Sequence, residues 1–188
     1  MTNPPDTSGE ARRIDGLYRA KARAEIAAAE SVAKAAGGVR GQGDVLAEVL
    51  LVKGQPGPDD VRTKRALSGE DGTAIGKALD ALGLPKPRYA FCTRATGSKA
   101  DASERVRLLT EAIDPRYVVL LDAAAAADFA EAFGAPPISP GVVSRVGGRT
   151  VVATDDFEGS LADESAKRRV WSQLRALAPK PGNETDAP

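Results

Sequence analysis

The chain has 188 residues with no histidine and one cysteine, and 26 lysines and arginines balance 26 aspartates and glutamates. The missing histidine excludes Ser-His-Asp and Cys-His catalysis and histidine-bound metals, and a single cysteine excludes an internal disulfide and a cysteine-based metal site. The charge balance argues against tight, non-specific nucleic-acid binding, although a local basic face would still allow weak binding to DNA. With no apolar run long enough for a membrane span and no apolar signal sequence, a cytoplasmic protein without membrane contact is expected.

The two ends of the chain have the composition of disordered segments. Residues 1–9 and 179–188 are rich in Pro, Thr, Asn, Asp, Ser and Gly. Residues 10–38 are rich in Ala, Glu, Lys and Arg and close on a glycine pair, which predicts a long amphipathic helix. Small side chains make its apolar stripe, so we expect it to lie on the domain, where it could dock a protein partner; the stripe is Leu17, Ala20, Ala24, Ala27 and Ala28.

Residues 45–178 alternate between patterns typical of strands and of helices. The predicted strands cover 45–54, 88–96, 116–122 and the second arm of a hairpin in 141–154, and the predicted helices cover 72–83, 101–113, 123–134 and 161–178. Strands rich in Val and Leu that alternate with helices form parallel sheets covered on both faces. The pattern therefore predicts an α/β fold, a three-layer αβα sandwich around a central four-stranded, mostly parallel sheet. We expect the last helix to bury Val170, Trp171, Leu174 and Leu177.

Ligands of such sheets bind beyond the carboxyl ends of the strands. The loops that we expect at this edge cover residues 54–60, 93–99, 122–124 and 155–159. Two aspartates, Asp155 and Asp156, follow directly where the last strand is predicted to end. Functional residues are therefore expected in these loops.

The order of the segments carries a family resemblance. "VLLVKGQPGPDD", "SGEDGTAIGKALDALGL", "PRYAFCTRAT", "IDPRYVVLLDAAAAADFAEAFG", "GGRTVVATDDFEGSL" and "AKRRVWSQL" follow one another between residues 45 and 177. In type and spacing they resemble the uracil-DNA glycosylase superfamily, nearest to the branch that carries an iron–sulfur cluster. The resemblance implies a uracil-DNA glycosylase-like fold and a link to DNA repair.

The chain departs from the family at the positions that the resemblance marks as functional. The water-positioning acid or Asn falls on Gly54, within a loop whose shape Gln55, Pro56 and Gly57 keep. The Phe that stacks on the flipped base falls on Asp71, the base-reading Asn on Cys92, and the His of the His-Pro-Ser motif on Asp156. The four cluster cysteines are absent, so we expect neither a cofactor nor a metal.

These replacements act against uracil excision. An anionic leaving group needs a hydrogen-bond donor or a positive charge aimed at it, whereas an ionised Asp156 would repel it. An aspartate at position 71 also removes base stacking, which is worth roughly 1–3 kcal/mol per base. A protein without the standard activity, a pseudoenzyme, is therefore expected.

Two acidic pairs are the candidate catalytic residues, and each has a structural alternative. Asp155 and Asp156 could form a divalent-metal or general-acid pair, or they could cap a helix or lie in a solvated turn before the last helix. Asp59 and Asp60 could supply the missing carboxylate, or they could be acids in the first turn of a short helix.

The basic clusters and the cysteine also allow two interpretations. Lys64 and Arg65, and likewise Lys167 and Arg168, could contact a nucleic-acid backbone. Alternatively, the second cluster lies on an exposed helix face, where Glu164 would pair with Arg168. A lone thiol such as Cys92 is more typical of a buried hydrophobic side chain than of a nucleophile.

Three functional hypotheses follow. In the first, the chain is a divergent uracil-DNA glycosylase-like protein without standard uracil excision that binds a nucleobase or nucleic acid. In the second, it is an active DNA glycosylase of altered specificity that uses Asp59 or Asp60 to position water. In the third, it is a protein-interaction module with a vestigial pocket, in which the N-terminal helix binds the partner.

Overall fold

The computed structural model describes residues 7–35, 38–95 and 99–178. The segments 1–6 and 179–188, which include most of the predicted disordered ends, lie outside the described residues. The elements in chain order are α1 (Thr7–Ala35), β1 (Gln42–Gly43), β2 (Val49–Lys53), α2 (Pro58–Thr63), α3 (Glu70–Ala81), β3 (Arg88–Cys92), α4 (Lys99–Ile113), β4 (Tyr117–Leu120), α5 (Ala123–Phe133), β5 (Ser144–Val146), β6 (Arg149–Ala153), α6 (Phe157–Ser160), α7 (Glu164–Leu174) and a final 3₁₀ turn (Arg175–Leu177).

The chain folds as an α/β protein around one mixed sheet in the order β1-β3-β2-β4-β6-β5. The inner strands β3, β2, β4 and β6 run parallel, and β1 and β5 add antiparallel edges. The described sheet thus has six strands where four were expected. β1 has two residues, too few for a hydrophobic period to reveal it. β5 belongs to the predicted hairpin, whose turn at Gly147 and Gly148 is confirmed by φ values of 55° and 82°.

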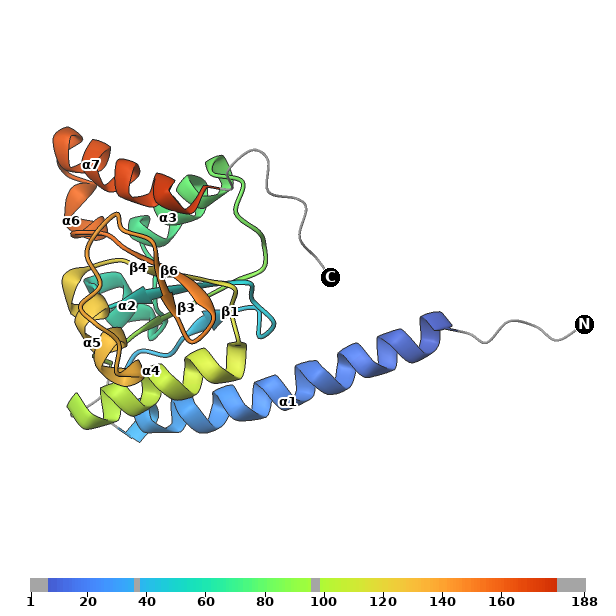
Figure 1. Cartoon of the computed structure of the whole chain (residues 1–188). Coiled ribbons are helices and arrows are strands. Elements are labelled where there is room, and N and C mark those ends of the chain that lie inside the picture. The colour runs from blue at the N-terminus through green and yellow to red at the C-terminus, as the bar shows by residue number, and fades with distance from the viewer. Residues whose placement is uncertain (1–6, 36–37, 96–98, 179–188) are drawn as a thin grey trace, which may run out of the picture.

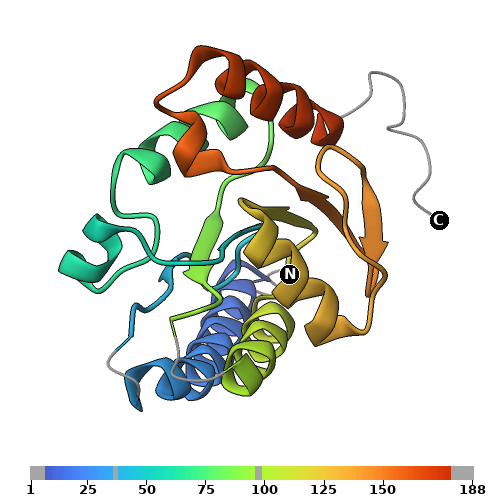
Figure 2. The ribbon, with the colours of Figure 1, turned by 90° about the vertical axis from the view of Figure 1, so that its left-hand side faces the viewer.

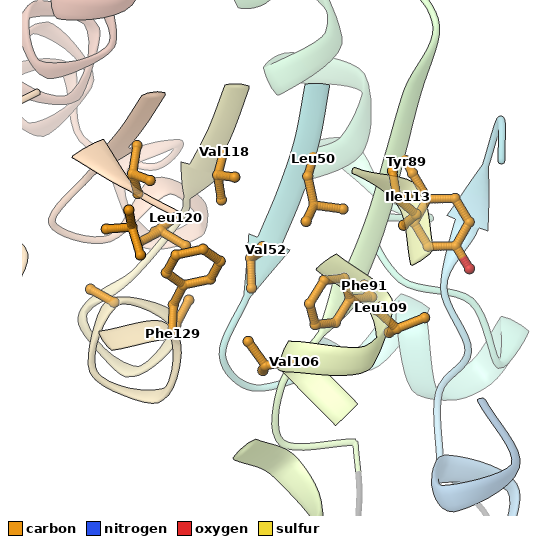
Figure 3. Packing of buried hydrophobic residues seen from close by; sticks show 14 of the residues in the cluster. Leu50, Val52, Tyr89, Phe91, Val106, Leu109, Ile113, Val118, Leu120 and Phe129 are labelled. Carbon is orange, nitrogen blue, oxygen red and sulfur yellow. The ribbon is translucent and has the colours of Figure 1, made fainter. Parts of the chain in front are cut away.

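Helices cover both faces of the sheet (Figures 1 and 2). Alternate residues of a strand point to opposite faces, and β2 divides its side chains in this way. Leu50 and Val52 face α4 and α5, where they pack with Val106 and Phe129 (Figure 3). Val49 and Leu51 face α3, α6 and α7. All five residues of β2 are buried, as expected for a central parallel strand.

The N-terminal helix packs through a different face from the predicted one. α1 lies beside α4 (Figure 2), and Ala22, Ile26 and Ala29 are buried there. The predicted stripe is exposed, and Leu17 keeps 63% of its surface accessible. The prediction was wrong because the buried face also contains Glu30, a charged residue that an apolar pattern cannot mark and that pairs with the buried Arg105 at 2.8 Å.

The predicted last helix, 161–178, divides into α7 and a 3₁₀ turn, and a short helix, α6, precedes it. Val170, Leu174 and Leu177 are buried as expected. Trp171 is not, because 37% of its surface is exposed. The step of about 100° per residue turns Trp171 away from the stripe that Val170 and Leu174 form at i, i+4 spacing.

Candidate functional site

The site lies at the carboxyl edge of the sheet, between the ends of β2 and β4. The chain passes from β2 to β3 on one side, and then crosses to β4 on the other side of β2. Such a reversal of strand order opens a crevice where parallel sheets bind ligands. Because β3, β2, β4 and β6 are parallel, the loops that follow them lie at this same edge, as the sequence predicted.

Gly54 and Asp122 close the floor of this crevice. The Gly54 N–H donates to Asp122 Oδ2 at 2.7 Å, and Asp122 Oδ1 accepts from the Ala125 N–H at 2.7 Å as the cap of α5. A Cβ at position 54 would lie 2.5 Å from Asp122 Oδ1 and 2.6 Å from the Ala124 Cβ. The position that the resemblance assigns to a catalytic acid thus has no room for a side chain.

A pocket of about 350 Å³ opens above this floor. Its apolar wall comes from Leu67, Leu121 and Phe157, and its polar wall is mostly carboxylate. An antiparallel bridge between Asp122 and Asp156 holds together the loops that follow β4 and β6. The complete lining is Lys53, Gln55, Leu67, Asp71, Leu121, Asp122, Ala123, Ala124, Asp155, Asp156, Phe157 and Glu158.

Lys53, the last residue of β2, is the cation of the site. Its side chain is 5% exposed, and its Nζ lies 2.7 Å from Asp71 Oδ2, 2.9 Å from Glu158 Oε2 and 3.1 Å from Asp60 Oδ2. Asp60 and Asp71 are buried, whereas the Glu158 side chain is about half exposed. Burial lowers the pKa of Lys53, but the hydrogen bonds to these carboxylates outweigh burial and hold the pKa above its ordinary value. Lys53 is therefore an ammonium and not a nucleophilic amine.

A second hollow, of about 450 Å³, lies against the same ion network. Lys53, Asp71 and Glu158 line both hollows. A Cβ at Gly57 would lie 2.6 Å from Glu158 Oε1. A glycine at this position therefore allows the Glu158 carboxylate to lie beside Lys53. The second lining consists of Lys53, Gly57, Pro58, Asp59, Asp60, Gly69, Glu70, Asp71, Glu158, Leu161 and Ala162.

The two acids predicted in the first loop lie in different surroundings. Asp60 is 1% exposed, and beside Lys53 it accepts from the Gly57 N–H at 2.9 Å and the Ser68 N–H at 3.0 Å. Its oxygens are thus used within the protein. Asp59 is half-exposed and pairs with Arg62 at 2.6 Å. Both are first-turn acids of α2, as the structural alternative predicted.

The acids after the last parallel strand are helix contacts. Asp156 caps α6, accepting from the Gly159 N–H at 2.9 Å. Asp155 is tied to α7, because Gln173 Nε2 donates to its Oδ2 at 2.9 Å and Arg169 lies 3.4 Å away. Both acids line the pocket, but each is engaged with a helix.

Cys92 lies in the core and not in the pocket lining. It is fully buried with Val39, Ala66 and Ala95, and its Sγ is 4.0 Å from Asp60 Oδ2. Burial raises the pKa of the thiol well above its usual value. An iron–sulfur cluster of the kind found in the resembled branch would need four cysteines. This chain has one, so its residues do not fit that cluster. Within the described ranges, no group of three or more histidine, cysteine, aspartate or glutamate side chains is arranged to hold a metal ion.

The predicted backbone-binding residues lie apart from the pocket. Lys64 and Arg65 line a third hollow beyond the far end of α2. Lys167 pairs with Glu164 at 2.7 Å, so the pairing of Glu164 with Arg168 was wrong by one residue. None of these four residues lines the pocket or the second hollow.

Sequence reasoning missed the residues that give the pocket its character. Lys53, Leu67 and Glu158 were not singled out from the sequence. Asp71, which falls on the family's stacking position, is buried in an ion pair with Lys53, whereas Leu67 gives the pocket an apolar surface. A signal for Lys53 existed, because a lysine that ends the run "VLLV" must either reach solvent or find carboxylates. No local pattern indicated that Glu158 would be one of them.

Comparison of the chain with models of known protein families and with curated protein sequences finds no match. Among the described helices, none is both long and apolar enough to cross a membrane.

Proposed function

We propose that this chain is a divergent uracil-DNA glycosylase-like protein, acting in the cytoplasm, whose pocket binds a nucleobase but does not excise uracil. The observation that carries the proposal is the ion network of Lys53 with the buried Asp60 and Asp71 and the half-exposed Glu158. Asp60 is the loop acid that was expected to position water, but it already accepts hydrogen bonds from Lys53 and from two backbone N–H groups. A general base needs a free oxygen directed at the water.

The fold class supports the family assignment. The family resemblance requires an α/β fold, and the four parallel inner strands with a pocket at their carboxyl edge are compatible with it. A volume of about 350 Å³ lies at the small end of the usual range for ligand pockets, roughly 300–1,000 Å³. It suits a single base or nucleoside.

The polar lining favours a base that carries an amino group. Asp71, Asp155, Asp156 and Glu158 line the pocket, and each already has a contact within the protein. A carboxylate oxygen can accept more than one hydrogen bond, so these acids still match the amino groups of cytosine, adenine and guanine. The carbonyl groups of uracil are acceptors too and would face these carboxylates unfavourably. Leu67 and Phe157 offer apolar surface to the faces of the ring.

An excision assay tests the proposal against the alternative of an active enzyme. The purified chain is incubated with single- and double-stranded DNA that carries uracil, hypoxanthine or an abasic site, and base release and mobility shift are both scored. We expect no release of uracil. Release that disappears in Asp60→Asn or in Asp59→Asn, but persists in Lys77→Gln at an exposed position elsewhere, would establish the glycosylase alternative and overturn the proposal.

A further inference from the structure

The third hollow, of about 630 Å³, has an opposite electrical character from the pocket. Arg40, Lys64 and Arg65 are its charged residues, and no acid is found in the lining that the structure describes. The other lining residues have small or uncharged side chains. We call this feature the arginine groove; its complete lining is Gly38, Arg40, Gly41, Gln42, Gly43, Thr63, Lys64 and Arg65.

Backbone pairing holds two arginines side by side in this groove. Arg40 and Arg65 are partners in a parallel bridge, with the Arg40 N–H donating to the Lys64 carbonyl at 3.1 Å and the Ala66 N–H donating to the Arg40 carbonyl at 2.9 Å. Both arginines are exposed, and no ion pair joins either guanidinium to a carboxylate of the described chain. Like charges placed opposite each other destabilise a strand pair. An anion between them would remove this repulsion.

The walls of the groove are fixed before any ligand arrives. The Gln42 side-chain amide donates to the carbonyls of Ala66 and Leu67, which joins the two segments. The backbone at Gly41 and Gly43 packs directly against β3. A Cβ at Gly41 would lie 2.5 Å from the Tyr89 ring, and a Cβ at Gly43 would lie 2.2 Å from the Arg88 carbonyl oxygen. A preformed site loses little entropy when it binds.

The acids and the bases lie at opposite ends of α2. Asp59 and Asp60 occupy its first turn and face the second hollow, while Lys64 and Arg65 follow its last turn and face the groove. Phosphate groups are repelled by the acid-rich sheet edge and attracted to the groove. The fork of an arginine suits phosphate oxygens, and two parallel forks can grip one group or span two neighbouring groups.

We propose that the arginine groove binds phosphate groups, carried either by a nucleic-acid strand or by a small phosphorylated molecule. The groove shares no lining residue with the pocket or the second hollow, so this inference does not rest on nucleobase binding. If the pocket binds no base, the groove can still bind phosphate, and the reverse also holds.

Two binding experiments on the full chain test the groove and separate the two sources. Fluorescence anisotropy follows a labelled oligodeoxythymidine at several salt concentrations, and calorimetry follows inorganic pyrophosphate. The test variant is Arg40→Gln with Arg65→Gln. The control is Lys77→Gln with Arg175→Gln, which removes two exposed charges elsewhere.

We expect the test variant to weaken binding at least about tenfold and the control variant to leave it unchanged. For the strand, loss of two phosphate contacts should also reduce the salt slope by about 0.7 per contact. Strand binding with this dependence identifies a nucleic acid as the source, and pyrophosphate binding alone identifies a small phosphorylated molecule. Binding that the test variant retains, or no binding in either experiment, would overturn the proposal. If the double variant fails to fold, the single variant Arg65→Gln gives the same comparison.

Discussion

Lys53 extends from the end of β2 into a space that three carboxylates surround. Its attraction to Asp60 and Asp71 has to offset the desolvation of all three groups, and this balance holds only while every partner is present. Glu158 differs, since about half of its side chain is in contact with solvent. The network thus has a buried part, which stabilises the site, and an exposed part, which borders the pocket.

Replacing Lys53 should therefore be costly. In Lys53→Met the carboxylates of Asp60 and Asp71 stay buried without their cation, and we expect the free energy of unfolding to fall by about 3–5 kcal/mol. Urea denaturation measures this change. Lys77→Met, an exposed lysine on α3, is the matched control and should change stability by less than about 0.5 kcal/mol. A loss below about 1 kcal/mol in Lys53→Met would show that the network contributes little.

The partly exposed member should behave like a surface ion pair. Glu158→Gln keeps the shape of the side chain and removes one charge, so we expect a loss of at most about 1 kcal/mol in the free energy of unfolding. The same urea titration measures it. A loss as large as that of Lys53→Met would mean that Glu158 is structurally equivalent to the two buried aspartates.

Cys92 should make the protein sensitive to alkali. Because burial raises its pKa in the folded protein, the folded state keeps a proton that the unfolded thiol releases above about pH 8.5. The contribution of the protonated Cys92 thiol to the free energy of unfolding is therefore complete below about pH 8.5. It is lost as the pH rises further, by up to about 1.4 kcal/mol per pH unit. Between pH 8 and 10, the free energy of unfolding should fall less steeply in Cys92→Ala than in the unmodified protein. Equal slopes in the two proteins would contradict this prediction.

At the scale of elements, α1 has two unequal halves. Its second half is anchored by Ile26 in the core and by the pair of Glu30 with Arg105, which also donates to the Cys92 carbonyl. In its first half, residues 9–18 are exposed, and this part extends beyond the sheet (Figure 1). A helical segment that buries little apolar surface is marginally stable in water.

Hydrogen exchange should reveal this difference. We expect amides of residues 10–18 to exchange orders of magnitude faster than those of residues 22–30, since the first group opens without unfolding the domain. Mass spectrometry of peptic peptides measures both groups in one experiment. Equal protection of the two groups of amides would contradict the inference that the first half of α1 is less stable than the second. Protection that grows with protein concentration would instead show that the first half is covered by another copy.

Most elements could be predicted because their signals are local. Val49–Lys53 reads as a buried strand, and Ile75 and Leu79 mark the core face of α3. The exposure of Trp171 could have been predicted, because it lies off the stripe that Val170 and Leu174 form at i, i+4 spacing. The buried face of α1 could not be predicted, because its Glu30 depends on Arg105, a partner far along the chain. The same holds for the site: the loops could be placed at the sheet edge, but the contact of Lys53 with Glu158 joins two of those loops through the fold.

For the whole molecule, a net charge of zero conceals two charged regions. Acids collect around the pocket and the second hollow, where Lys53 is the one basic residue among the described lining. The arginine groove has the opposite charge. The overall balance argued against tight binding of nucleic acid, yet it is the separation of the charges that decides which surface an anion meets.

The central claim, that the pocket binds an amino-bearing base, is tested most directly by nuclear magnetic resonance. Cytosine, adenine and uracil are titrated separately into the ¹⁵N-labelled chain. We expect cytosine or adenine to shift the amides of Gln55, Asp122 and Phe157 and to lose affinity in Ala123→Leu, which narrows the pocket, but not in Ala127→Leu, an exposed position on the same helix. Uracil should bind more weakly than either. Absence of shifts with every base, or uracil binding as tightly as cytosine, would contradict the claim.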